Sequence, residues 1–236
     1  MTLTAAGQQA VETARRIEGE VVTLADNIGG DKTEPTGTVR VTTTEGFAQT
    51  VLRALTPLHE RYPGLAIDVM TSSAAADLRR READLAVRMF RDDHDGLAMR
   101  KLGVCGWSLY ASAQYLAGKT IGPRLLDGHH VIGYGDALKA MVGAVWVTEH
   151  APPDSIRLRC GNPRAALDAA LAHAGVAVLP CYLAAAHPLV RLTDQVIASS
   201  EVYAVFLPER RGEARLRVVI DALVGLLDRE RATFSG

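Results

Sequence analysis

Residues 35–47 read PTGTVRVTTTEGF, and the fold can be worked out from this stretch. A proline and a glycine open it, and the alternation over residues 38–43 predicts a half-buried strand. A helix over residues 46–62 is predicted to follow. Three hydroxyls and a carboxylate stand where the strand ends and the helix begins: Thr42, Thr43, Thr44 and Glu45.

Strands and helices alternate beyond this stretch. Short strands are predicted at residues 65–70, 84–88, 131–133, 156–159 and 176–179, and longer ones at residues 102–111 and 201–207. Further helices are predicted at residues 74–81 and 213–229. The βαβαβ order at the start requires parallel pairing with right-handed crossovers. We therefore predict an α/β fold with helices on both faces of a sheet.

The ends of the other predicted strands also carry polar groups. They are Ser72 and Ser73 after the second strand, Arg88 at the end of the third, Tyr134 in the second half, and Asn162 before Pro163. Ligands of open α/β sheets sit beyond the carboxyl ends of the strands, where helix N-termini offer free N–H groups. Each residue has an alternative role: Ser, Thr and Asn cap helices without binding a ligand, and Arg88 can pair with Glu45 or with Asp92 and Asp93. The convergence of several such strand ends favours a ligand site.

The composition argues against several classes of protein. Lys and Arg number 26 against 27 Asp and Glu, and this balance disfavours a surface built to neutralise nucleic-acid phosphates. Three scattered cysteines, Cys105, Cys160 and Cys181, fit a reducing compartment, with the thiols as small core residues. The N-terminus lacks the apolar segment of a signal peptide, and no stretch is apolar enough to span a membrane. A cytoplasmic location is predicted.

The sequence contains incomplete versions of two enzyme motifs and no metal-binding motif. GWSLY around Ser108 lacks the second glycine of a nucleophile elbow, and VIGYGDALKA has Leu138 where a dinucleotide-binding loop needs its third glycine. The seven histidines show no HxxxH or HExxH spacing. We predict no catalytic residues, no metal and no cofactor.

The first thirty residues are of a different kind. Small or apolar residues recur at spacings of three and four: Gly7, Ala10, Ala14, Ile17, Val21, Leu24 and Ile28. This heptad pattern predicts a helix over residues 1–30, with Thr4 as its N-cap, that pairs with another chain along a narrow seam. The alternative is an amphipathic helix that lies on its own domain. Residues 31–37, DKTEPTG, form the predicted linker.

Several segments, taken in order, resemble the LysR-type transcriptional regulators. They are PTGTVRVTTTEGF, LTPLHERYPGLAIDV, DLRRREADLAVRM, LYASAQYLA and AGVAVLP. Before them, LTAAGQQAVETARRI is similar to the segment that leaves the winged helix-turn-helix of that family and becomes the dimerisation helix. The resemblance covers essentially the whole chain, whereas the DNA-binding domain of the family is expected to be missing.

The resemblance implies a two-lobed fold like that of type 2 periplasmic binding proteins, with residues 102–111 and 201–207 as crossover strands. Residues 37–109 and 202–236 would then form lobe I, and residues 110–201 would form lobe II. A ligand pocket between the lobes would be lined by Thr43, Thr44, Glu45, Ser72, Ser73, Arg88, Tyr134 and Asn162. Glu45 departs from the small or polar residue that family members often carry, and it would repel an anion unless Arg88 neutralises it.

The function implied is that of an effector-sensing domain that binds a small polar, carboxylate-bearing metabolite. Such a domain would pair with itself as a homodimer or tetramer and contact DNA only through the missing domain. The alternative is a solute-binding protein of a transport system, which has the same fold. The heptad helix favours the regulator, because a solute-binding protein does not need it.

Overall fold

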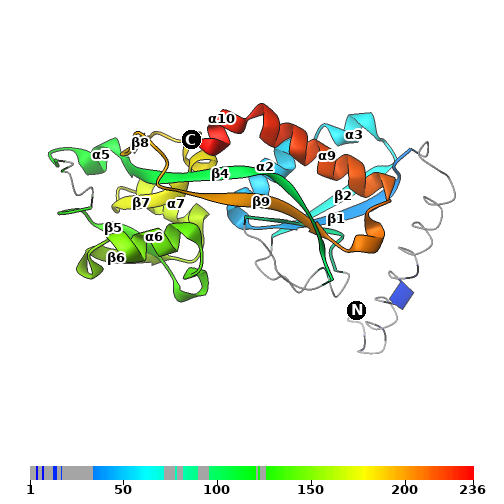
Figure 1. Cartoon of the computed structure of the whole chain (residues 1–236), viewed down its shortest axis with the longest axis horizontal. Helices are drawn as coiled ribbons and strands as arrows, with labels where there is room; N and C mark the ends of the chain where they lie inside the picture. The colour runs from blue at the N-terminus through cyan, green and yellow to red at the C-terminus, as the bar shows by residue number, and fades with distance from the viewer. Residues whose placement is uncertain are drawn as a thin grey trace.

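The chain forms one continuous, curled sheet that two groups of helices cover (Figure 1). The computed structural model describes residues 34–71, 78, 82–89, 96–120, 122 and 126–236, together with Thr4, Gly7, Thr13, Ala14 and Ile17. Within this part of the chain the sheet has nine strands, in the order β2-β1-β3-β9-β4-β7-β5-β6, with β8 paired to β4. This arrangement confirms the α/β class predicted from the alternation of strands and helices.

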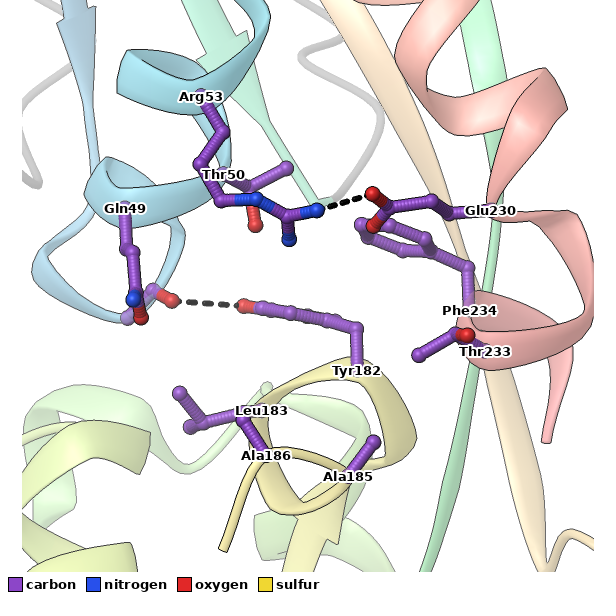
Figure 2. A pocket seen from close by; sticks show the side chains of 11 residues that line it. Gln49, Thr50, Arg53, Tyr182, Leu183, Ala185, Ala186, Glu230, Thr233 and Phe234 are labelled. Atoms are coloured by element: carbon purple, nitrogen blue, oxygen red, sulfur yellow. Dashed lines mark hydrogen bonds and ion pairs between the residues drawn. The ribbon is translucent and has the colours of Figure 1, made fainter.

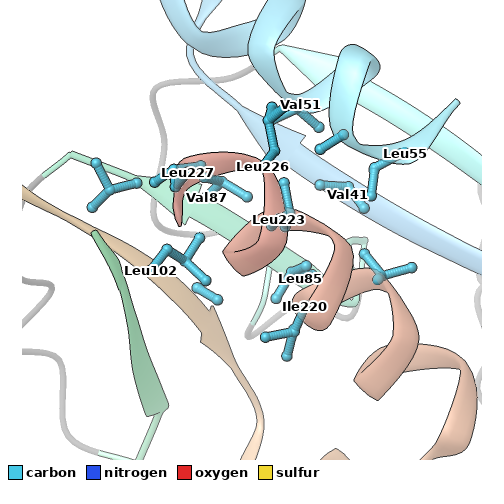
Figure 3. Close-up of a cluster of buried hydrophobic side chains, with 14 of the residues drawn as sticks. Val41, Val51, Leu55, Leu85, Val87, Leu102, Ile220, Leu223, Leu226 and Leu227 are labelled. Carbon is cyan, nitrogen blue, oxygen red and sulfur yellow. The ribbon is translucent and has the colours of Figure 1, made fainter. Parts of the chain in front are cut away.

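Lobe I is built on the parallel strands β1, β2 and β3. Its elements are β1 (Gly37–Thr43), α2 (Glu45–Leu55), α3 (Leu58–Arg61), β2 (Leu65–Thr71), β3 (Leu85–Arg88), the 3-10 turn η4 (Pro208–Arg210) and α9 (Ala214–Arg229). Helices α2 and α9 pack on one face of these strands, where Val41 and Val87 meet Val51 and Leu223 (Figure 3). Val41, Val51 and Leu223 are completely buried, so this cluster anchors the lobe by removing apolar surface from water.

Lobe II repeats the alternation around strands β5, β6 and β7. Its elements are α5 (Ala113–Leu116), β5 (Val131–Tyr134), η2 (Asp136–Leu138), α6 (Val142–His150), η3 (Pro153–Ser155), β6 (Ile156–Cys160), α7 (Pro163–Leu171), β7 (Val176–Pro180), α8 (Cys181–Ala184) and β8 (Leu189–Arg191). Two apolar clusters lie on opposite faces of the sheet, one around Leu167 and Leu179 and the other around Trp107 and Val178. Lobe II therefore has its own core.

Two long antiparallel strands join the lobes. They are β4 (Ala98–Ser112) and β9 (Ala198–Phe206), which pair with each other from Ala98↔Phe206 to Trp107↔Ala198. Strand β9 continues the sheet of lobe I through β3, and β4 continues that of lobe II through β7. The last helix, α10 (Arg231–Ser235), returns from α9 to the point where the two lobes meet, near α8 (Figure 1). The crossover strands predicted at residues 102–111 and 201–207 are confirmed, although both are longer than predicted.

One predicted helix was wrong in its extent. Residues 46–62 form two helices instead of one, because α2 ends at Leu55 and α3 begins at Leu58. Pro57 has no N–H to donate to the carbonyl four residues earlier, so it interrupts the helix after Thr56. The helices α6, α8 and α10 and the strand β8 were not predicted.

Three other predictions fall wholly or largely on residues outside the described part. The helix predicted at residues 74–81 is described only at Leu78, which is helical and buried. Of the helix predicted over residues 1–30, the described residues Gly7, Thr13, Ala14 and Ile17 are helical, and the Gly7 N–H donates to the Thr4 hydroxyl (3.2 Å), as an N-cap requires. The linker at residues 31–37 is described from Glu34 onward.

The three cysteines are free and buried, which confirms their predicted place in the core. In the described part of the chain, no helix combines the length and the apolar character that a membrane crossing requires.

Candidate functional site

The N-terminus of helix α2 points from lobe I toward lobe II. Thr44 is its N-cap residue, yet the Thr44 side chain makes no capping hydrogen bond. The first N–H groups of an α-helix have no partner within the helix, so those of Glu45 and Gly46 depend on other groups or on solvent. This end of α2 therefore presents unused donors and the positive end of the helix dipole.

The N-terminus of helix α7 comes toward the same place from lobe II. Asn162 is its N-cap, and the Asn162 side-chain oxygen accepts a hydrogen bond from the Ala165 N–H (2.8 Å). Pro163 occupies the first helical position, where its missing N–H carries no penalty. A Cβ atom placed on Gly46 would lie 3.8 Å from the Pro163 Cβ and 3.9 Å from the Arg164 backbone nitrogen. The two helix N-termini therefore meet across the boundary between the lobes.

The capping role considered for Asn162 is confirmed, and that considered for Thr44 is not seen. Asn162 uses its oxygen on its own helix, which leaves its amide N–H groups for other partners. Thr44 is half-buried and keeps its hydroxyl unused for capping. Of the two, Thr44 is the better placed to bind a ligand.

Three other predicted residues lie deeper in the fold. Thr43 is fully buried, and its hydroxyl donates to the Val87 carbonyl on the neighbouring strand (3.4 Å). Arg88 ends β3 and is 1% exposed, so lobe I holds a guanidinium almost entirely out of water at the end of a parallel strand. The Tyr134 hydroxyl donates to the Val178 carbonyl inside lobe II (2.5 Å), and burial raises the pKa of Tyr134 above its usual value. Their roles as ligand contacts stay predictions.

The charged neighbours proposed for Arg88 are separate from it or outside the described part. Glu45 is exposed at the start of α2, whereas Arg88 is buried, and no ion pair joins them. Asp92 and Asp93 lie outside the described residues, as do the predicted ligand residues Ser72 and Ser73. Glu45 is therefore free to face solvent at this edge.

Tyr182 lies at the junction, the place where the two lobes meet, and it was not predicted from the sequence. Its hydroxyl donates to the Gly46 carbonyl (3.0 Å), so a side chain of lobe II holds the first turn of α2 in lobe I (Figure 2). Its ring packs against the apolar clusters of both lobes. Burial raises the pKa of Tyr182 well above its usual value, so the hydroxyl stays protonated and remains a donor. A signal was available, because Tyr182 follows the carboxyl end of β7, at the edge where ligands are expected.

Tyr182 belongs to a group of three aromatic rings from three separate segments. Its ring stacks on Phe234 of α10 (centroids 4.9 Å apart, planes 17° apart) and meets Phe47 of α2 edge-on (5.2 Å, 82°). Phe47 and Phe234 also meet edge-on (6.0 Å, 66°). Edge-on and stacked pairs at these distances are favourable beyond the area they bury. The aromatic cluster, Phe47, Tyr182 and Phe234, therefore joins the lobes without any charge.

The chemistry available at the junction is that of binding. Uncharged donors, helix N-termini and a buried guanidinium can hold an anion or a polar molecule, whereas none of these groups is arranged as a nucleophile and base. Within the described residues, no group of three or more His, Cys, Asp or Glu side chains is placed to hold a metal ion.

Comparison with known proteins agrees with this arrangement. The family model of the LysR substrate binding domain matches residues 32–228. The chain is 27% identical to the HTH-type transcriptional regulator PtxR of Pseudomonas aeruginosa, over 98% of this chain and 77% of that protein. It is also 27% identical to the HTH-type transcriptional regulator CrgA of Neisseria meningitidis, over 95% of this chain and 78% of that protein.

Solved structures extend the comparison to the fold. The structure of CrgA, a LysR-type transcriptional regulator from Neisseria meningitidis, superposes with a TM-score of 0.72 at 25% identity, over 96% of this chain and 80% of that one. A Corynebacterium glutamicum OxyR mutant superposes with a TM-score of 0.73 at 14% identity, over 98% of this chain and 77% of that one, which supports the fold alone. The chain therefore belongs to the LysR family of transcriptional regulators and contains its effector-binding domain.

Proposed function

We propose that this domain binds a small polar metabolite that carries a carboxylate, in the cleft between the lobes where the N-termini of α2 and α7 meet. The observation that carries the proposal is the N-terminus of α2, whose cap residue Thr44 leaves its hydroxyl unused while the first N–H groups lack helical partners. Two helix dipoles directed at one place favour an anion there without requiring a cation beside it.

The residues divide into contacts and supports under this proposal. Thr44, the first N–H groups of α2 and the Asn162 amide contact the ligand, and Ser72 and Ser73 are expected to join them. Thr43, Arg88 and Tyr134, which lie deeper, support the cleft and stay predicted contacts of the ligand. The exposed carboxylate of Glu45 accepts from an amine or hydroxyl of the same ligand, because it would repel a second anionic group.

Binding regulates the protein through the relative arrangement of the lobes. Only the part of the binding free energy that differs between two lobe arrangements can shift the equilibrium between them. The signal passes to a DNA-binding domain that is not among these 236 residues. The matched relatives support this, since both are named HTH-type regulators and the chain covers 77% and 78% of their lengths. We place the protein in the cytoplasm and assign it no enzymatic activity.

A thermal-shift screen of organic acids and amino acids tests the ligand site. A ligand at 100 times its dissociation constant should stabilise the domain by about 2.7 kcal/mol. Thr44→Val should weaken binding about tenfold, because it removes one hydrogen bond to a charged group. Thr148→Val is the matched control, since the Thr148 hydroxyl only bonds the Ala144 carbonyl within α6. A ligand that binds Thr44→Val as tightly as the parent would place the site elsewhere.

Self-association is the second part of the proposal. The seam at Ala10, Ala14 and Ile17 should make the chain a dimer or tetramer, and Ile17 is 55% exposed in the single chain. Sedimentation of residues 1–236 and of residues 36–236 separates the contribution of the helix from that of the lobes. Two monomers at high concentration would contradict the heptad interpretation.

A further inference from the structure

A pocket lies at the lobe boundary, beside α2, α8 and α10. Its volume is about 420 Å³, which is within the range of small-molecule sites (Figure 2). Its walls come from α2 in lobe I, from α8 and the residues after it in lobe II, and from the end of α9 with α10. None of the side chains predicted to bind the effector lines this pocket, although Gly46, whose N–H is assigned to the effector, also borders it.

A hydroxyl inside the pocket has no hydrogen-bond partner. Thr50 lines the pocket on α2 and is 5% exposed, and its hydroxyl makes no hydrogen bond to any described residue. A helical threonine can bond to the carbonyl four residues earlier, which is that of Gly46. That carbonyl instead accepts from the Tyr182 hydroxyl (3.0 Å), and the Thr50 oxygen points into the pocket (Figure 2). A ligand in the pocket can therefore form a hydrogen bond with the Thr50 hydroxyl.

An ion pair borders the same space. Arg53, one turn after Thr50, pairs with Glu230 at the end of α9, and their side chains are 54% and 24% exposed. A guanidinium has five N–H donors, and Arg53 uses one of them toward the described residues, so it can still receive a carboxylate beside the Thr50 hydroxyl. A carboxylate alone would be repelled by Glu230. A ligand that also carries an ammonium group satisfies both charges.

Part of the remaining wall is apolar. Leu183, Ala185 and Ala186 line it, and Tyr182 and Phe234 close the inner side (Figure 2). Gln49 and Thr233 also line the pocket, and the apolar part of the wall suits a hydrocarbon side chain of a few carbons.

We propose that this pocket is a second ligand site that takes a small zwitterion, namely an α-amino acid with an apolar side chain. Its carboxylate binds Arg53 and the Thr50 hydroxyl, its ammonium group binds Glu230, and its side chain lies on Leu183 and Ala186. Because the walls belong to both lobes, a bound ligand stabilises this arrangement of the lobes independently of the cleft.

Isothermal titration of the full chain tests the site with three probes of similar shape. L-leucine carries both charges, 4-methylpentanoate lacks the ammonium group, and 3-methylbutylamine lacks the carboxylate. L-leucine should bind at least about tenfold more tightly than either analogue, since each lacks one charge-assisted hydrogen bond. Equal binding of 4-methylpentanoate and L-leucine, or no binding of L-leucine up to about 10 mM, would overturn the proposal.

Variants locate the binding and separate it from the cleft. Thr50→Val and Glu230→Gln should each weaken L-leucine binding about tenfold. Thr44→Val, which affects only the cleft, and Asp228→Asn, which breaks a neighbouring exposed ion pair with Arg231, should leave it unchanged. Ala186→Trp fills the pocket from an exposed position and should abolish L-leucine binding. This variant keeps the proposal testable if Thr50→Val or Glu230→Gln fails to fold. Binding of L-leucine that depends on Thr44 and survives Ala186→Trp would overturn this site and leave the cleft as the site.

Discussion

The two ends of strands β1 and β3 are built in opposite ways. At the starting end, near the linker, three buried charged side chains, Asp84, Glu213 and Arg215, lie together with the partly buried Arg210. At the finishing end, where the lobes meet, the contacts are made by hydroxyls, backbone carbonyls and aromatic rings, and several donors remain unused. Strands β1 and β3 are parallel, so they carry the anchor, a network of ion pairs, at one end and the junction of the lobes at the other, where the buried guanidinium of Arg88 lies beside uncharged contacts.

The anchor is a chain of ion pairs among Asp84, Arg210, Glu213 and Arg215. Arg210 pairs with Asp84 and with Glu213 (2.7 Å), and Glu213 also accepts from Arg215 (3.0 Å). Asp84 further accepts from the Arg40 backbone N–H (2.8 Å), which ties the group to β1. The side chains of Glu213 and Arg215 are only 2% and 5% exposed. Buried charges of this kind are tolerated only when each one has a partner.

The two ends of the strands are expected to have different roles, one in fixing the chain and the other in responding to a ligand. The anchor lies against the point at which the chain enters lobe I. Gly37 is the first residue of β1, and a Cβ atom placed on it would lie 3.1 Å from the Arg215 guanidinium, so the two groups pack closely. Gly37 has a φ of +88°, which only glycine adopts without strain. The junction is held by a hydrogen bond and by aromatic packing, so we expect it to be the part that changes when a ligand binds.

The largest expected effect is at the anchor. Glu213→Gln should reduce the free energy of unfolding by about 3 kcal/mol at pH 7, because it leaves Arg215 buried without a carboxylate. Urea denaturation measures the change. Arg100→Gln breaks an ion pair with Asp221 whose side chains are about half exposed, and it should cost less than about 0.5 kcal/mol. Equal losses in the two variants would contradict the difference between anchor and surface.

The same carboxylate should make the domain sensitive to acid. Burial favours a higher pKa for Glu213, but the hydrogen bonds and charges of Arg210 and Arg215 outweigh it and hold the pKa below its usual value. The stabilisation is therefore present above the unfolded pKa of about 4.3 and is lost as the pH falls through the lower folded pKa. The free energy of unfolding, measured between pH 3 and 6, should fall less steeply in Glu213→Gln than in the parent.

The next effect is at the junction. Phe234→Leu should cost about 2 kcal/mol, because it removes the ring contacts with Phe47 and Tyr182 and leaves space in their place. Phe206→Leu is the matched control, since Phe206 is a buried ring of lobe I outside the aromatic cluster. Both variants should lose stability, and only Phe234→Leu should change ligand affinity. Equal affinities in both would show that the cluster does not connect the lobes to the cleft.

The smallest effect is that of a single hydroxyl. Tyr182→Phe should cost about 1 kcal/mol, because it removes one hydrogen bond to the Gly46 carbonyl and keeps the ring. Thermal unfolding measures the loss, and titration with a ligand from the screen measures the affinity. A loss above about 3 kcal/mol would mean that the junction is as strongly fixed as the anchor.

The sequence predicted most of the fold because the signals were local. The Pro and Gly before β1, the alternation within it, and Asn162 with Pro163 at α7 all act within a few residues. The break at Pro57 was missed because the helical pattern of apolar residues continues across it into α3. The strands β4 and β9 were predicted shorter than they are, since their ends are fixed by pairing with each other.

The site was predicted only where its residues stand at strand ends. The helix N-termini that Thr44 and Asn162 cap lie close together, and the roles of these two residues as ligand contacts stay predictions, whereas Tyr182 and Phe234 were missed. The Tyr182 hydroxyl bonds to a residue 136 positions away, and Phe234 reaches the junction only because α10 folds back from α9. Local sequence patterns do not predict such long-range contacts, because these contacts arise from the packing of the two lobes.

The central claim is that one ligand contacts both helix N-termini. An NMR titration of the full chain with a carboxylate ligand from the screen measures this directly, through the backbone amide signals of Gly46 on α2 and Arg164 on α7. Both signals should shift with the same dissociation constant, and both shifts should be reduced in Thr44→Val. A shift at only one of the two amides, or different dissociation constants for them, would contradict binding between the lobes.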